Sequence, residues 1–264
     1  MSDITHIGRT IDPRLASNRV ALLLPMGAGL LLFGLGDLRR AMAGGLATFA
    51  AWAIARELDP DRPRSATLAA TLAVCAALAV GTPAPAPLFI ALVTLRILVR
   101  TTGLPPKATD LAVVSAAAVA AADTPWGWAA GILLAFAIVR DAALPGDPPA
   151  AAAIWGAVTA VGVTVRVALS DELGLWEYPD LTALVVLVTG IVGAAIVVRP
   201  VPVLSLGDYT LVPLEPRRLR EGAVFGILTA VVVVLVAGHA GVVAVAPLLL
   251  AFAAVAVGRV LDDG

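Results

Sequence analysis

The chain contains 264 residues, of which 60% are hydrophobic and 14% are charged, and its mean hydropathy is +0.96. A water-soluble fold of this length could not bury that much apolar surface, so the composition predicts a protein that has the lipid bilayer as its solvent. The formal net charge of −1 provides no basic footprint and excludes nucleic acid as a partner. Cys75 stands alone in an apolar stretch, which excludes an internal disulfide and favours a small buried thiol.

Ten apolar runs follow one another along the chain, separated by short charged or Pro/Gly-rich breaks. We expect helices at residues 20 to 36, 41 to 56, 66 to 81, 86 to 99, 110 to 123, 127 to 143, 150 to 170, 181 to 198, 222 to 238 and 241 to 258. Several are shorter than the roughly 20 residues that a perpendicular span requires. Helices are favoured because they pair every backbone group that hydrocarbon would leave unpaired. The predicted fold class is therefore all-α, a polytopic transmembrane helical bundle with nine or ten spans.

The pattern indicates one membrane domain without a separate soluble domain. Its expected parts are an N-terminal cytoplasmic tail at 1 to 19, a transmembrane domain at 20 to 258 with a cytoplasmic linker at 199 to 221, and a C-terminal tail at 259 to 264. The first apolar run lacks a small-residue cleavage site and is expected to be a retained helix. With the N-terminus in the cytoplasm, only Arg39 and Arg40 fall in an outer loop, so the positive-inside rule places both termini inside for ten spans. Arginine outnumbers lysine by 17 to 1, which is typical of a GC-rich prokaryotic genome and suggests the cytoplasmic membrane of a prokaryote.

Carboxylates at the expected membrane face are the sharpest functional candidates. One cluster lies between the second and third apolar runs and another between the sixth and seventh: Glu57, Asp59 and Asp61, and Asp141 and Asp147. Paired carboxylates can hold Mg²⁺ against a diphosphate, and neighbouring basic side chains can neutralise phosphate oxygens. The candidate basic residues are Arg56, Arg62, Arg64, Lys107 and Arg140. The alternative is that these acidic and basic side chains form salt bridges with each other.

Two segments carry a resemblance to a known family. They are Ala51-Trp-Ala-Ile-Ala-Arg-Glu-Leu-Asp-Pro-Asp-Arg-Pro-Arg-Ser65 and Phe136-Ala-Ile-Val-Arg-Asp-Ala-Ala-Leu-Pro-Gly-Asp147. They resemble the two Asp-rich motifs of the UbiA superfamily of intramembrane prenyltransferases. The resemblance implies a helical bundle that binds a polyprenyl diphosphate through Mg²⁺ held by Asp59, Asp61, Asp141 and Asp147. The second motif departs from the family pattern, which spaces its aspartates four residues apart on one helical face, because the aspartates here are six residues apart.

Two other functions fit the same sequence. An inverted-repeat transporter of small solutes would have halves near 20 to 123 and 127 to 258 around a midplane site. A non-catalytic membrane scaffold or lipid-binding protein would fit a helix bundle whose interior has few polar side chains. Arg96 and Arg166, each about a turn from a helix end, are expected to extend to the headgroups, and Asp110 is expected to cap a helix.

Overall fold

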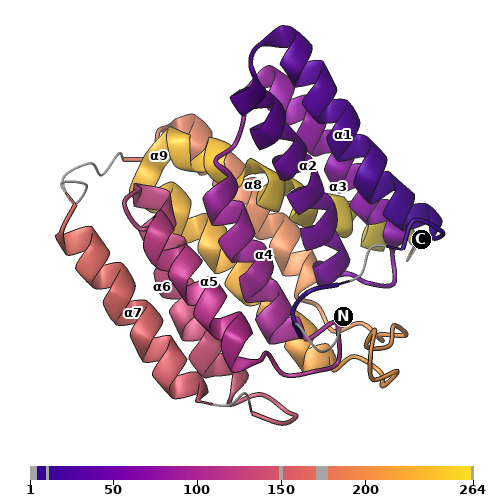
Figure 1. The fold of residues 1–264 in the computed structure, drawn as a ribbon. Helices are drawn as coiled ribbons and strands as arrows, with labels where there is room; N and C mark the ends of the chain where they lie inside the picture. The colour runs from indigo at the N-terminus through magenta and orange to yellow at the C-terminus, as the bar shows by residue number, and fades with distance from the viewer. Residues whose placement is uncertain (1–4, 10–11, 149–150, 171–177, 263–264) are drawn as a thin grey trace.

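A computed structural model describes residues 5 to 9, 12 to 148, 151 to 170 and 178 to 262. Within these ranges the chain forms nine helices and no β-strand, which confirms the all-α fold class (Figure 1). The helices are α1 (Ala16–Leu35), α2 (Leu38–Leu58), α3 (Pro63–Ala79), α4 (Pro85–Val99), α5 (Ala108–Ala121), α6 (Pro125–Asp141), α7 (Ala152–Ala168), α8 (Leu181–Val197) and α9 (Pro216–Asp262). A linker of residues 198 to 215 connects α8 to α9.

The long helix α9 is broken at Gly238, whose backbone angles are φ 51° and ψ −131°. The described chain therefore contains ten helical segments, matching the ten apolar runs. A side chain is strained at this positive φ, so glycine is what allows the chain to turn between the two halves of α9.

Replacing Gly238 with valine is expected to destabilise the fold by about 1 to 3 kcal/mol, the usual magnitude for a side chain forced into a disfavoured backbone region. Thermal unfolding of the detergent-purified protein measures this effect. Gly34→Ala is the matched control, because a Cβ atom at Gly34 meets no other atom within 4 Å. Equal melting temperatures for Gly238→Val and wild type would contradict the strained turn.

Connections between helices gather at two ends of the bundle. The end that carries residues 59 to 62, 100 to 107, 142 to 148, the linker and the N-terminal segment (residues 5 to 9) is called the polar end. At the opposite end, one cavity of about 630 Å³ is lined by residues at the starts of α2, α4 and α6 and by residues that follow the break in α9. Residues 5 to 9 lie at the polar end, and so does the end of α9, where Arg259 pairs with Asp59.

Basic residues are distributed unequally between the two ends. All 18 lysine and arginine residues fall in the described ranges, and only Arg39, Arg40 and Arg166 lie at the opposite end. The sequence likewise predicts that basic residues concentrate in the breaks on one side of the bundle and that only Arg39 and Arg40 lie in a break on the other side.

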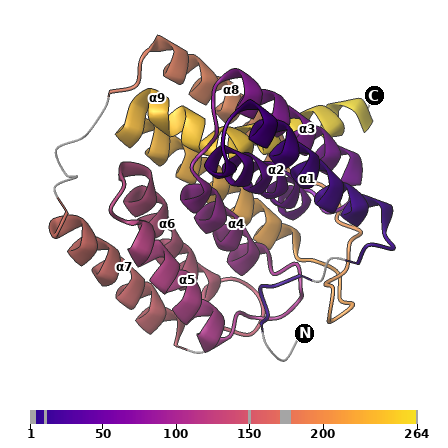
Figure 2. The same cartoon turned by 45° about the horizontal axis from the view of Figure 1, so that its top comes forward.

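Helix α9 lies at the centre of the packing and contacts α2, α3, α4, α6 and α8. Helices α7 and α1 lie at two edges of the molecule in both views (Figures 1 and 2). Large apolar side chains point outward on the edge helices, including Leu30 on α1 with 72% exposure and Val161 on α7 with 62%. Cys75 is also exposed, so the expectation of a buried thiol was wrong.

Two helices are long and apolar enough to cross a membrane by length and composition, in the windows Asn18–Leu35 and Pro216–Leu261. Five other apolar helices, namely α3, α4, α5, α7 and α8, contain 14 to 17 residues. At about 1.5 Å per residue, such helices are about 21 to 26 Å long, against about 30 Å for the hydrocarbon core. By this criterion the expected nine or ten spans reduce to two clear ones.

Several helices begin earlier than the apolar runs suggest. Helix α1 begins at Ala16, α2 at Leu38 and α9 at Pro216, because each helix continues into polar residues that hydropathy alone leaves out. Residues 216 to 221 are thus helical rather than part of the linker, and Pro216 is suited to a first helical position. Helix α7 begins at Ala152, and residue 150, where we expected its start, lies outside the described residues.

Candidate functional site

Asp141, at the end of α6, lies between two arginines. Its side chain has 0% exposure. Arg100 donates to both carboxylate oxygens, from Nε to Oδ1 at 3.0 Å and from Nη2 to Oδ2 at 2.9 Å. Arg218 donates from Nη1 to Oδ1 at 2.6 Å. We call these three residues the Asp141 clamp; it connects the ends of α4, α6 and α9.

The arginines of the Asp141 clamp also hold backbone carbonyls. Arg100 Nη1 donates to the Asp147 carbonyl at 2.8 Å. Arg218 donates to the carbonyls of Pro145 and Leu98 at 2.7 and 3.0 Å. Carbonyls at helix ends and tight loops have no intrahelical partner, so these arginines fix the loop after α6 against α4.

Asp59, at the end of α2, has a similar environment. Its Oδ2 accepts from Arg62 Nη1 and from Arg259 Nε, both at 2.9 Å. Arg259 also donates from Nη1 to the Val197 carbonyl at 2.6 Å. This Asp59 clamp (Asp59, Arg62 and Arg259) connects the ends of α2, α8 and α9, and both Asp59 and Arg259 are buried.

Asp61 holds the linker rather than a cation. Its Oδ2 accepts from the Leu204 backbone N–H at 2.9 Å, and its Oδ1 accepts from the Ser205 backbone N–H at 2.8 Å. The Ser205 hydroxyl donates to the same Oδ1 at 2.5 Å. A carboxylate that accepts three donors of the linker fixes the linker beside the loop between α2 and α3.

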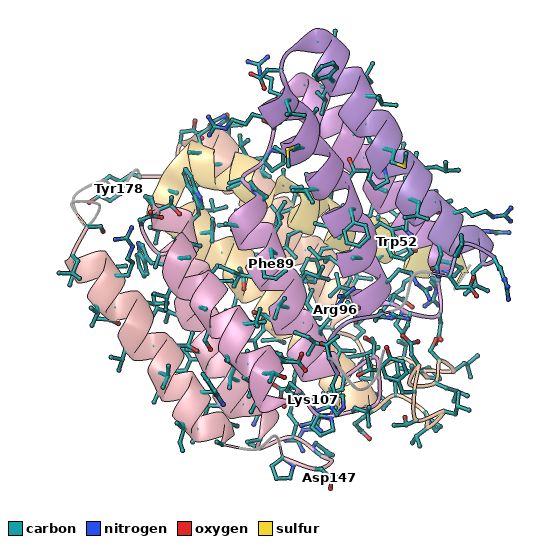
Figure 3. The ribbon with its side chains drawn as sticks, in the orientation of Figure 1. Trp52, Phe89, Arg96, Lys107, Asp147 and Tyr178 are labelled. Atoms are coloured by element: carbon teal, nitrogen blue, oxygen red, sulfur yellow. The ribbon has the colours of Figure 1, made fainter. Side chains whose placement is uncertain are left out.

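The other predicted site residues lie apart from these clamps. Asp147 is exposed at the tip of the polar end (Figure 3), and Arg64 is exposed at the start of α3. Arg140 pairs with Glu221 of α9, from Nε to Oε2 at 3.1 Å and through a second contact. The backbone N–H of Lys107 donates to Asp110 Oδ2 at 3.0 Å, which confirms that Asp110 caps α5.

The four aspartates do not fit a site for Mg²⁺ and a diphosphate. Asp59 and Asp141 are neutralised by arginines, Asp61 accepts three donors of the linker, and Asp147 is exposed. Among the residues that the structure describes, no three His, Cys, Asp or Glu side chains lie close enough to hold a metal ion. The salt-bridge alternative therefore describes Asp59, Asp141, Arg62 and Arg140 in this structure.

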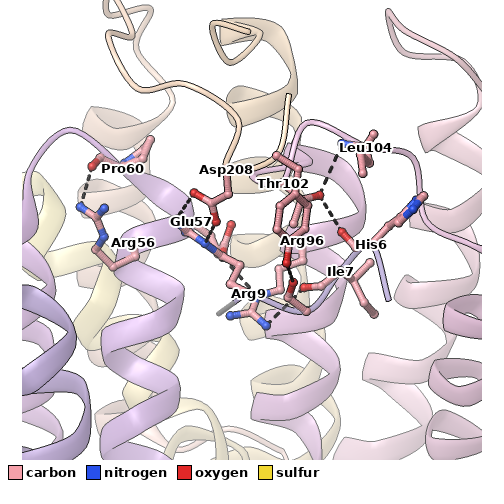
Figure 4. Close-up of polar contacts among 12 residues, drawn as sticks. His6, Ile7, Arg9, Arg56, Glu57, Pro60, Arg96, Thr102, Leu104 and Asp208 are labelled. Carbon is pink, nitrogen blue, oxygen red and sulfur yellow. Dashed lines mark hydrogen bonds and ion pairs between the residues drawn. The ribbon is translucent and has the colours of Figure 1, made fainter. Parts of the chain in front are cut away.

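The N-terminal segment crosses the polar end and is tied to α5, to the loop between α4 and α5, and to the linker. The Thr5 hydroxyl and the His6 backbone N–H donate to Asp110 at 2.5 and 2.9 Å. Thr102 donates to the His6 carbonyl at 2.6 Å, and the Tyr209 hydroxyl to the Gly8 carbonyl at 3.2 Å. Figure 4 shows the segment between α2, α4 and the linker.

A cavity of about 420 Å³ lies where this segment meets α1, α2, α4 and the linker. Its charged lining consists of Arg9, Arg56, Glu57, Arg96 and Asp208, and we call it the arginine cavity. Arg96 Nε donates to Glu57 Oε1 at 3.1 Å, and Arg9 Nη1 lies 3.6 Å from the same oxygen. Arg9 also pairs with both carboxylate oxygens of Asp208 at 2.6 and 3.0 Å (Figure 4).

Arg9 stays charged in the arginine cavity. Burial lowers the pKa of Arg9, but the carboxylates of Glu57 and Asp208 outweigh this effect and raise that pKa above its ordinary value. Arg96, which we expected to extend to the headgroups, instead pairs with Glu57, and Arg166 pairs with Asp123 at 3.1 Å.

The fold and site define the class of protein as an all-α bundle whose helix ends are joined by buried arginine–carboxylate pairs. Comparison of the chain with protein-family models, with curated proteins and with solved structures finds no match.

Sequence reasoning named Arg56 and Glu57 of the arginine cavity as candidates and singled out Arg96, but it did not bring these residues together in one site. It missed Arg9, Trp52 and Asp208 as site residues, and it also missed the clamp residues Arg100 and Arg218. One usable signal was available, because Trp52 interrupts the Ala-rich end of its apolar run one turn before Arg56. A tryptophan beside an arginine at a helix end offers an indole N–H next to a cation.

Proposed function

We propose that this protein is a multi-pass integral membrane protein that binds lipid, with its polar end in the cytoplasm. The proposal rests on the exposure of the apolar helix α1. Only 17% of its window Asn18–Leu35 is buried inside the molecule. On a soluble protein, exposed apolar surface of this extent would mark a site that contacts a membrane or a partner. On a helix that faces lipid, such a surface is ordinary.

The asymmetry of basic residues supports the orientation. Arginine and lysine concentrate at the polar end, and positive charge is retained on the cytoplasmic side of membrane proteins. The short helices are compatible with this arrangement where they lie inside the bundle. Helix α4, for example, buries most of its residues against neighbouring helices, so its full length does not face lipid.

Lipid binding is favoured over Mg²⁺-dependent prenyl transfer because of what the carboxylates contact. Asp59 and Asp141 are enclosed by arginines, whereas the arginine cavity offers cations beside apolar side chains. That combination suits an amphiphile with an anionic head. The proposed role is that of a membrane scaffold whose polar end holds the headgroup of a lipid.

Alkaline carbonate extraction of membranes from cells that express the full chain tests this proposal. We expect the protein to remain in the membrane pellet and to enter the supernatant only with detergent, because carbonate releases proteins that do not cross the hydrocarbon core. Release by carbonate without detergent would refute the proposal of a multi-pass protein.

A further inference from the structure

The arginine cavity has an unbalanced charge. Its lining holds three guanidinium groups and two carboxylates. Arg9 and Arg96 contact Glu57, and Arg9 also contacts Asp208. Arg56 donates only to the Pro60 carbonyl, and no carboxylate of the described chain forms an ion pair with it. The lining therefore has one positive charge in excess, which a ligand group with one negative charge would balance.

Two polar atoms of residues that line the cavity are buried and have no hydrogen-bond partner among the described residues. They are Nε1 of Trp52, a residue with 7% exposure, and Oε2 of Glu57, a residue with 0% exposure. Trp52 and Arg96 lie on the neighbouring helices α2 and α4 (Figure 3). Buried polar groups in native proteins are nearly always paired, so an unpaired donor and an unpaired acceptor beside one cavity indicate a ligand that supplies both partners.

The remaining wall is partly apolar, and it also includes Asn18 and Tyr209. Leu15, Phe49 and Ala53 line the cavity together with the charged residues. The ring centroids of Phe49 and Trp52 lie 6.1 Å apart. An apolar wall beside cations suits a molecule that joins a charged head to a hydrocarbon chain. Inorganic phosphate would leave this wall without a partner.

We propose that the arginine cavity binds an anionic phospholipid whose headgroup carries a hydroxyl, such as a phosphatidylglycerol. The phosphodiester lies at Arg56 and Trp52 Nε1, and the headgroup hydroxyl donates to Glu57 Oε2. A phosphodiester carries one negative charge and balances the excess of the wall. This assignment rests on the proposed membrane function and specifies the lipid class.

Native mass spectrometry of the detergent-purified full chain tests the assignment with matched lipids of equal acyl chains. Phosphatidylglycerol has the charge and the hydroxyl, phosphatidylmethanol has the charge without the hydroxyl, and phosphatidylcholine has neither the net charge nor a donor. We expect affinity to fall in that order, with about tenfold between the first and the last, the ratio that one charge-assisted contact supplies. Inorganic phosphate is not expected to compete.

Two variants locate the site. Arg56→Gln removes the unpaired charge, and Trp52→Phe removes the N–H but keeps an aromatic ring. Each substitution is expected to lower the affinity for phosphatidylglycerol about five- to tenfold. Arg220→Gln is the control, because Arg220 is an exposed arginine of the polar end outside the cavity. Circular dichroism and the melting temperature establish that each variant folds.

Equal affinity for the three lipids in wild type and variants would mean that only annular lipid is bound and would overturn the assignment. Competition by inorganic phosphate would show a site for free anions and would also overturn it. A protein that resists carbonate but does not discriminate among the lipids would refute this site alone. A protein released by carbonate would refute the membrane proposal itself.

Discussion

Asp141→Ala is expected to destabilise the fold more than any other single polar substitution in this chain, by about 3 to 5 kcal/mol. The carboxylate is fully buried and accepts from Arg100 and Arg218. Removing it leaves two buried guanidinium groups without their counter-ion, and an uncompensated buried charge is much less favourable than an intact pair. Thermal unfolding in detergent and the yield of monodisperse protein measure the loss.

Asp147→Ala is the matched control for this prediction. Asp147 is an exposed aspartate six residues further along the chain, and only its backbone carbonyl contacts the Asp141 clamp. We expect its melting temperature to stay close to that of wild type, since surface substitutions usually change stability by less than about 0.5 kcal/mol. Comparable losses in both variants, or a stable Asp141→Ala protein, would contradict the structural role of the clamp.

Arg259→Ala is expected to have the second largest effect, again about 3 to 5 kcal/mol. Arg259 neutralises buried Asp59 and donates to the Val197 carbonyl at the end of α8. Its loss leaves Asp59 with Arg62 as its ion-pair partner from the clamp and frees a carbonyl that has no helical partner. Thermal unfolding measures the stability, and protease cleavage in the linker measures the separation of α8 from α9.

Arg217→Ala serves as the control for Arg259→Ala, because Arg217 is an exposed arginine in the first turn of the same helix. We expect neither its stability nor its protease pattern to change. Arg259→Lys separates charge from geometry, since lysine keeps the charge but cannot reproduce the fork of a guanidinium. Full stability of Arg259→Ala would show that the Asp59 clamp does not hold α8 to α9.

The helices were predictable from the sequence because they depend on local information. Each apolar run contains residues that favour a helix in a dry environment, and each ends at a charged residue, proline or glycine. The break at Gly238 was visible as well, as a Gly-His-Ala-Gly interval between two apolar runs. The early starts at Ala16 and Pro216 were not, because hydropathy does not register polar helical turns.

The contacts of the polar end could not be predicted in the same way. Arg259 is 200 residues from Asp59, and Arg9 is 199 residues from Asp208. Which cation meets which carboxylate depends on how the helices pack, and the sequence shows only that both charges occur near helix ends. Family motifs directed the sequence analysis to the aspartates as metal ligands, whereas the structure surrounds Asp59 and Asp141 with arginines.

The most direct test of the account is a labelling experiment on the two ends of the bundle. Single cysteines are placed at Leu204 in the linker and at Arg39 at the opposite end, both exposed, in a Cys75→Ser background. Intact spheroplasts are then treated with a membrane-impermeant maleimide. A multi-pass protein with its polar end in the cytoplasm predicts labelling at residue 39 alone, and labelling at both positions only after permeabilisation. Labelling of residue 204 in intact spheroplasts would contradict the orientation, and equal labelling at both positions would contradict a protein that spans the membrane.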